Sequence, residues 1–82
     1  MDDATFRVTV AADSTTTHTV TVPPSYAARL TNGKGTAEAL VEKSFDFLLQ
    51  RESNTSILRS FELSVIERYF PGYETAISKA FS

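Results

Sequence analysis

Apolar and polar side chains alternate along two early stretches of the chain, residues 5–12 and 17–22. Alternation with a period of two, in segments rich in valine and threonine, is typical of half-buried β-strands. Turn-forming side chains at residues 13–16 separate the two stretches, so the pattern predicts an antiparallel hairpin. The rest of the chain must cover its apolar face, and an uncovered edge is able to pair with a second copy. That face would carry Phe6, Val8, Val10, Ala12, His18, Val20 and Val22.

After the hairpin, the apolar residues recur at the period of a helix. A pair of prolines ends the second strand, and the second of them, Pro24, suits the first turn of a short helix over residues 24–30. The Asn32-Gly33 pair favours a left-handed turn that ends this helix. Thr36 is a good N-cap for a longer amphipathic helix over residues 36–51. The apolar stripe of the longer helix consists of Ala37, Leu40, Val41, Phe45, Leu48 and Leu49.

The last third of the chain is rich in apolar residues and has two interpretations. Helical spacing over residues 57–70 indicates one helix that is buried on several sides. In the alternative, which we favour, the helix breaks near Leu63, because Ser64 and Glu67 match the S-x-x-E capping box. A Pro-Gly pair then turns the chain into a final helix over residues 72–81. The spacing over the first of these stretches is carried by Leu58, Phe61, Val65 and Tyr69.

Several aromatic residues are candidates both for the core and for contact with another molecule. We expect Phe61, Val65 and Tyr69 to be core, because their spacing is regular. Around and after the Pro-Gly pair, the sequence is equally compatible with core and with interface, since aromatic anchors are enriched at interface centres. Phe47 lies off the stripe of the long helix and joins this second set. The candidate interface therefore comprises Phe47, Phe70, Tyr73, Ile77 and Phe81.

These elements predict an α+β fold in a single compact domain over residues 1–82, with the hairpin first and the helices after it. A chain of 82 residues buries only about 60–65% of the surface that it exposes when unfolded, so it is modestly stable alone. Its hydrophobic content of 41% and charged content of 22% are those of a globular protein. We expect such a chain to form a homo-oligomer or to bind a protein partner.

Composition argues against several functional classes. The absence of cysteine excludes disulfides and sulfur-ligated zinc, and a single histidine argues against a transition-metal site. A net charge of -2 and a pI near 5.2, with dispersed basic residues, give no footprint for nucleic acid. The sequence has no apolar run long enough to cross a membrane and no signal-peptide pattern. We therefore expect a cytoplasmic protein that uses no cofactor and no metal.

Two positions are candidates for chemistry. His18 is able to act as a general base, yet it lies on the apolar face of its strand without an orienting partner, so we interpret it as a histidine that borders the core. Lys34, Gly35 and Thr36 lead into a helix N-terminus, where backbone N–H groups favour an anion. They lack the full G-x-x-x-x-G-K-[ST] pattern. We interpret them as a turn between helices, with anion binding as the alternative.

Residues 17–30, with the sequence THTVTVPPSYAARL, resemble ribbon-helix-helix DNA-binding proteins. In that family a strand precedes two helices, and the paired strands of a dimer enter the major groove. The resemblance implies that Thr17, Thr19 and Thr21 touch DNA while Thr36 lies at a phosphate. A competing first strand, a short first helix and an acidic pI oppose it, so we do not assign the chain to that family.

The sequence therefore leads to three hypotheses about function. The first is a small, non-enzymatic protein-interaction or assembly module. The alternative is a ribbon-type DNA-binding regulator, dimeric and built from a strand and two helices. The third and weakest is a small-anion binder or enzyme that uses the loop at Lys34.

Overall fold

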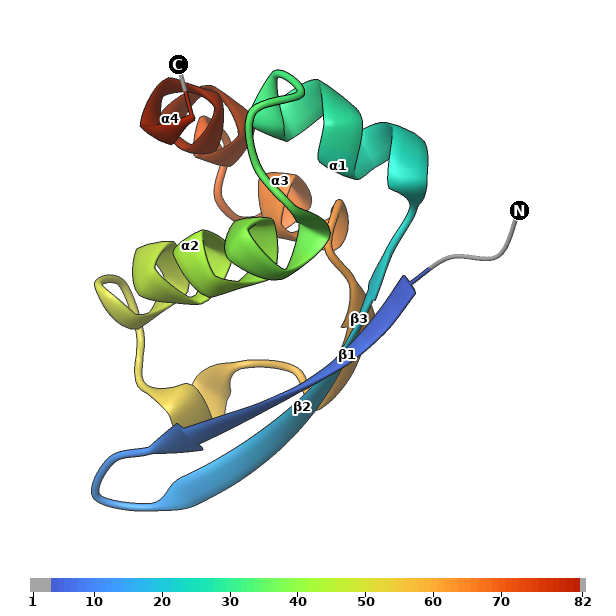
Figure 1. The fold of residues 1–82 in the computed structure, drawn as a ribbon. Coiled ribbons are helices and arrows are strands. Elements are labelled where there is room, and N and C mark those ends of the chain that lie inside the picture. The colour runs from blue at the N-terminus through green and yellow to red at the C-terminus, as the bar shows by residue number, and fades with distance from the viewer. Residues whose placement is uncertain (1–3, 82) are drawn as a thin grey trace.

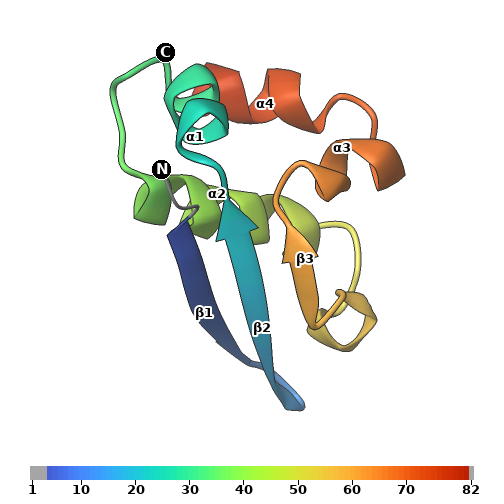
Figure 2. The same ribbon diagram turned by 90° about the vertical axis from the view of Figure 1, so that its right-hand side faces the viewer.

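The computed structural model describes residues 4–81 and has the predicted α+β fold. A three-stranded sheet forms one layer, and the helices cover one of its faces (Figure 1). β1 (Ala4–Ala11) and β2 (Thr15–Val22) are the two arms of the predicted hairpin. β3 (Ser60–Glu62) lies on the other side of β2, so the order across the sheet is β1, β2, β3 (Figure 2).

The alternation of side chains decides which face of the hairpin lies under the helices. Phe6 is opposite Val20 and Val8 is opposite His18 in the antiparallel register. Val20 and His18 are fully buried, whereas the threonines on the other face of β2 are mostly exposed. The predicted period of two is therefore confirmed. β2 begins at Thr15 rather than at residue 17, which places His18 within the strand instead of at its start.

α1 (Pro24–Thr31) follows directly from the hairpin, with a proline in its first turn as predicted. Asn32, with a φ of 56°, and Gly33, with a φ of 71°, adopt the left-handed conformations that end the helix. The Asn32 side chain also donates a hydrogen bond to the carbonyl of Ser78, 3.2 Å away in α4 (Tyr73–Ala80). The turn that ends α1 thus also attaches it to the last helix.

α2 (Ala37–Leu49) is the central helix, and it begins with the predicted cap. The hydroxyl of Thr36 accepts a hydrogen bond from the backbone N–H of Ala39 at 3.0 Å. The ring of Phe45 lies 5.4 Å from that of His18 and 6.2 Å from that of Phe61, measured between centroids. α2 therefore packs on the inner face of the sheet, and Figure 1 shows α1 and α4 above it with the hairpin below.

Residues 54–69 differ from the helix expected to begin at residue 57. η1 (Asn54–Ser56) is a single 3-10 turn, after which the chain extends into β3. β3 pairs in parallel with β2, with Phe61 opposite Val20. The helix starts only at α3 (Val65–Tyr69), directly after Ser64. The favoured break near residue 63 is therefore confirmed, and sheet pairing is the reason that no helix forms before it.

A carboxylate in α3 caps the helix that follows rather than its own. Ser64 donates its hydroxyl to Glu62 at 2.7 Å, and it makes no side-chain cap to α3. The carboxylate of Glu67 accepts hydrogen bonds from the backbone N–H groups of Glu74 at 2.8 Å and Gly72 at 3.0 Å. These bonds, the one from Glu74 above all, lower the pKa of Glu67 below its ordinary value. The S-x-x-E motif thus correctly marks the start of α3, but its two side chains contact Glu62 and the start of α4 instead of forming a capping box.

Tyr73 joins α4 to α2 within the core, where it is fully buried. Ser44 donates its hydroxyl to the Leu40 carbonyl at 2.7 Å, so the Tyr73 hydroxyl, 2.6 Å away, donates to the Ser44 oxygen. The Tyr73 ring meets Phe47 edge-on, with centroids 5.3 Å apart. Burial raises the pKa of Tyr73 above its ordinary value, which keeps the phenol in the protonated form that can donate.

Candidate functional site

An apolar groove opens beside β3, between that strand, α3 and the segment that leads into β3. Its volume is about 320 Å³. Two of its apolar side chains are unusually exposed, Leu58 at 48% and Tyr69 at 66%. We call this feature the α3 groove. Its apolar walls include Leu58, Phe61, Val65, Ile66, Tyr69 and Phe70.

β3 is an edge strand, and within residues 4–81 no strand lies on its outer side. The backbone N–H of Thr19 in β2 donates to the carbonyl of Arg59 at 2.7 Å. Consecutive residues of a strand direct their backbone groups to opposite sides, so Arg59 and Phe61 face β2. Ser60 and Glu62 therefore direct their N–H and C=O groups toward the open side, where an added strand would bind.

The open edge and the α3 groove adjoin each other. Phe61 belongs to β3 and also lines the groove. Figure 2 shows β3 at the margin of the sheet, with α3 above it. A strand that pairs with Ser60 and Glu62 would therefore pass across the groove, and every second side chain of it would face the same side as Phe61.

A buried chain of hydrogen bonds fixes the segment that carries Leu58. His18 donates from Nδ1 to the Leu58 carbonyl at 2.8 Å. The Asn54 amide donates to the hydroxyl oxygen of Thr16 at 2.9 Å, and that hydroxyl lies 2.8 Å from His18 Nε2. Because the Leu58 carbonyl only accepts, Nδ1 carries the ring hydrogen in this tautomer, so Nε2 accepts a hydrogen bond from the Thr16 hydroxyl. Both ring nitrogens of His18 are engaged, so the histidine positions the groove wall instead of facing an open cleft.

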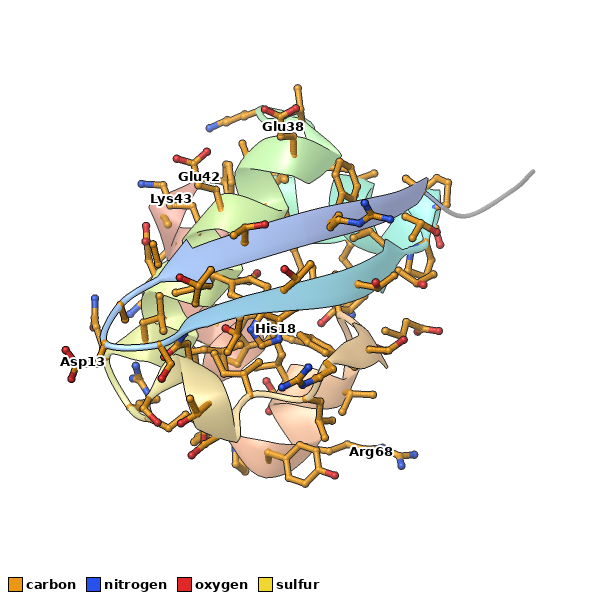
Figure 3. All side chains as sticks on the ribbon, turned by 90° about the horizontal axis from the view of Figure 1, so that it is seen from below. Asp13, His18, Glu38, Glu42, Lys43 and Arg68 are labelled. Atoms are coloured by element: carbon orange, nitrogen blue, oxygen red, sulfur yellow. The ribbon has the colours of Figure 1, made fainter. Side chains whose placement is uncertain are left out.

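His18 lies deeper than a residue that borders the core, since it is fully buried. Figure 3 shows it on the helix side of the strands. In the same view, Glu38, Glu42 and Lys43 lie along α2, Asp13 lies at the hairpin turn and Arg68 lies on α3, and all five point away from the core. Among residues 4–81, no group of three or more potential metal ligands comes together. No helix in that range combines the length and the apolar character needed to cross a membrane.

The expectation that Phe61, Val65 and Tyr69 form the core needs correction. Tyr69 is largely exposed, while Phe61 and Val65 are only half-buried along the groove. Their regular spacing places them on one face of a helix only if the chain is helical throughout. Because β3 interrupts that helix, the three side chains line a surface groove instead.

The five residues proposed as an interface fall into two groups. Phe47, Tyr73 and Ile77 are buried in the core, so their side chains contact the interior of the chain rather than its surface. Phe70 and Phe81 are half-buried. Of the five, Phe70 lines the α3 groove, whereas Phe81 packs on the loop before α2.

The loop proposed as an anion site is an exposed turn against which Phe81 packs. A Cβ atom at Gly35 would lie 2.5 Å from Cε1 of Phe81, so the aromatic ring rests on the Gly35 backbone. The hydroxyl of Thr36 caps α2 through Ala39. Lys34 is exposed. Helix capping and the contact with Phe81 account for this sequence without a ligand.

Two further hollows have more polar surroundings. One of about 370 Å³ lies between α1 and α4, where Arg29 forms an ion pair of 3.2 Å with Glu74. Tyr26 donates its hydroxyl to the same carboxylate at 3.0 Å. The other, of about 480 Å³, lies between the hairpin turn and the loop that follows α2. The carboxylate of the first hollow is thus already paired within the chain.

A ribbon-type DNA-binding dimer requires a free edge on β2, and the sheet order within residues 4–81 leaves β2 without one. β2 pairs with β1 on one side and with β3 on the other. It therefore has no edge left for the β2 strand of a second copy. Thr17 and Thr19 do point outward, but they lie in the middle of a three-stranded sheet.

The sequence carries one weak signal for the groove. Ser60, Phe61 and Glu62 alternate as polar, apolar and polar, which is compatible with a short edge strand. Three residues are too few to outweigh the helical spacing around them.

Comparison with known proteins finds no matching family model, no matching curated protein and no matching solved structure.

Proposed function

We propose that this chain is a small, cytoplasmic, non-enzymatic protein-interaction or assembly module. It binds an extended strand of a protein partner at the open edge of β3. One observation carries the proposal: the outward-facing backbone groups of Ser60 and Glu62 lie directly beside an apolar groove that leaves Leu58 and Tyr69 exposed.

Strand addition at a sheet edge combines two sources of affinity. Backbone hydrogen bonds attach the incoming strand, and pockets beside the edge select its alternate side chains. Here Ser60 and Glu62 each offer one donor and one acceptor, which allows four backbone hydrogen bonds. An aromatic anchor in the groove would bury about 150–250 Å². Full burial of such a side chain contributes about 1.5–3 kcal/mol, before the cost of association is subtracted.

Two observations support the non-enzymatic part of the proposal. His18 is fully buried, with both ring nitrogens hydrogen-bonded within the chain. The α3 groove is lined mainly by apolar side chains, and among the described residues 4–81 Glu52 is its one ionisable side chain apart from the phenol of Tyr69. General acid–base catalysis needs positioned titratable groups that reach a substrate. The cytoplasmic assignment rests on the cysteine-free sequence.

Photo-crosslinking in cells that express the chain tests the proposal. A photoreactive phenylalanine analogue replaces Tyr69, which is exposed at the groove, and a matched variant carries it at Thr9, which is exposed on β1. The expected result is a covalent adduct through position 69 whose partner peptide maps to one extended segment, with no such adduct through position 9. Equal adducts at both positions, or none at position 69, would refute the interaction surface.

A further inference from the structure

We propose that the strand bound at the α3 groove presents a basic side chain, lysine or arginine, whose cationic group pairs with the carboxylate of Glu52. This inference rests on the proposed function and names the chemistry of the partner. Glu52 follows the end of α2, is half-buried and lines the groove. Within residues 4–81, its carboxylate has no hydrogen bond and no ion pair.

The two hollows that Glu52 borders contain no cation to neutralise it. One is the α3 groove, and the other is the hollow of about 480 Å³ at the hairpin turn, where Asp13 is a second anion. Among residues 4–81, no lysine or arginine lines either of them. The neighbouring cation, Arg51, is held elsewhere, because its guanidinium lies 3.6 Å from the centre of the Phe47 ring and donates to the Phe47 carbonyl at 3.0 Å. The carboxylate is therefore open to a cation from outside the chain.

The C-terminal end of α2 adds to the negative potential at Glu52. The backbone N–H of Glu52 donates to the carbonyl of Leu48 at 2.9 Å, so the residue lies beside the last turn of the helix. The carbonyls at a helix C-terminus favour a cation nearby and disfavour an anion. α2 has no basic residue in its last turn. Within the chain alone, a carboxylate is unfavourable at this position, and a bound cation removes that cost.

The other charges around the groove cancel one another. Arg59 precedes β3, and Arg68 is exposed on α3. Glu62 lies in β3, and Glu67 lies in α3. These two cations and two anions surround the groove but do not line it. The charge that an incoming strand meets on the described groove walls is therefore the negative charge of Glu52, and a positive side chain complements it.

The apolar walls of the groove fit the stem of such a side chain. Lysine and arginine bury their methylene groups on apolar surface while the charged head reaches a polar partner. The rings of Phe61, Tyr69 and Phe70 line the same groove, and aromatic faces attract cations. A wholly apolar side chain would displace water from Glu52 and leave its carboxylate without a partner, which is unfavourable. A basic side chain complements both the walls and the carboxylate.

The stability of Glu52→Gln tests this inference without a ligand. Because the carboxylate is unpaired and lies at the negative end of α2, its loss should leave the denaturant midpoint unchanged or raise it. Circular dichroism measures the midpoint. A lower midpoint would assign the carboxylate a role within the fold and would overturn the inference.

Selection of short random peptides from a displayed library, with the full chain as bait, tests the chemistry of the partner. Peptides that bind the wild type but not Tyr69→Ala use the groove, and they should be enriched in lysine or arginine. The ratio of these two residues shows which head the site prefers. Selection on Glu52→Gln should lose the enrichment. Groove-dependent peptides without basic residues overturn the inference and retain the proposed function, whereas failure to recover any groove-dependent peptide contradicts both.

Calorimetric titration with one selected peptide measures the contribution of the carboxylate. Glu52→Gln should raise the dissociation constant by about fivefold. Glu42→Gln removes the same charge from the exposed side of α2 and should bind as the wild type does (Figure 3). Glu52→Lys should prefer the peptide in which glutamate replaces the basic residue, a reversal that a merely structural role does not produce. An unchanged dissociation constant for Glu52→Gln, or equal weakening by both glutamine variants, overturns the inference.

The photo-crosslinking experiment separates the two proposals in cells. A partner segment that is joined to position 69 and carries a lysine or arginine supports both. A joined segment without a basic residue retains the interaction function and overturns the pairing with Glu52. The absence of adducts at position 69 overturns both.

Discussion

Replacement of His18 by leucine should destabilise the protein through the loss of two hydrogen bonds, one buried and one part-buried. The Leu58 carbonyl loses the donor at 2.8 Å, and the Thr16 hydroxyl loses the acceptor at 2.8 Å. A buried group left without its partner costs about 1–3 kcal/mol. The leucine side chain recovers roughly 1.5–3 kcal/mol through apolar burial. The net loss of unfolding free energy should therefore be about 2 kcal/mol, with the contact to Phe45 retained in part.

Denaturant unfolding followed by far-ultraviolet circular dichroism measures this loss, since the chain has no tryptophan to report by fluorescence. Thr17→Val provides the control, because Thr17 is exposed on the same strand and should change stability by less than about 0.5 kcal/mol. Thr16→Val should cost less in the His18→Leu background than in the wild type, since the two residues share one hydrogen bond. A loss below about 0.5 kcal/mol, or strictly additive effects, would refute the hydrogen-bond chain.

Two other predictions concern the C-terminal helix and the residue after it. Glu67→Gln should lower stability near neutral pH, because it weakens the cap on Gly72 and Glu74. The pKa of Glu67 is lowered in the folded protein, so the extra stability of the wild type over Glu67→Gln should be lost as the pH falls through that pKa. Denaturant midpoints of both proteins over a pH series measure this stability difference. A difference that does not change with pH would contradict the capping role. Gly35→Ala should cost no more than about 1 kcal/mol, because its Cβ would meet the ring of Phe81 at 2.5 Å but that half-buried ring is able to shift. The same substitution in a Phe81→Ala background should be nearly neutral in thermal unfolding, and an undiminished cost there would count against the contact.

The features that the sequence predicts well are those that depend on neighbouring residues. The hairpin follows from strict alternation, and the start of α2 follows from Thr36, whose hydroxyl binds the N–H of Ala39. The end of α1 follows from Asn32 and Gly33, which adopt the left-handed conformation. Each of these signals acts over a few residues, so no knowledge of the tertiary structure is needed to interpret it.

β3 and the α3 groove depend on a contact between residues that lie 41 positions apart in the sequence. Ser60–Glu62 becomes a strand because β2 offers its edge, with Val20 opposite Phe61. The helical spacing of Leu58, Phe61, Val65 and Tyr69 outweighs a three-residue alternation in any local analysis. The same contact turns residues that were expected in the core into the walls of a surface groove.

The exposure of the C-terminal aromatic residues also depends on tertiary packing. Tyr73 points into the core because Glu67 and the corner at Gly72 direct α4 back over α2. Phe70, three residues earlier, is left half-buried at the groove. A sequence shows both residues as aromatic and helical in spacing, and only the direction of α4 separates them.

Amide hydrogen exchange at β3, measured by NMR on the chain alone in dilute solution, tests the central claim most directly. The account predicts that the Ser60 and Glu62 amides exchange rapidly, because they face the open edge of the sheet. The Phe61 amide, which faces β2, should exchange slowly. Ser60 and Glu62 amides that exchange as slowly as that of Phe61 would contradict the open edge.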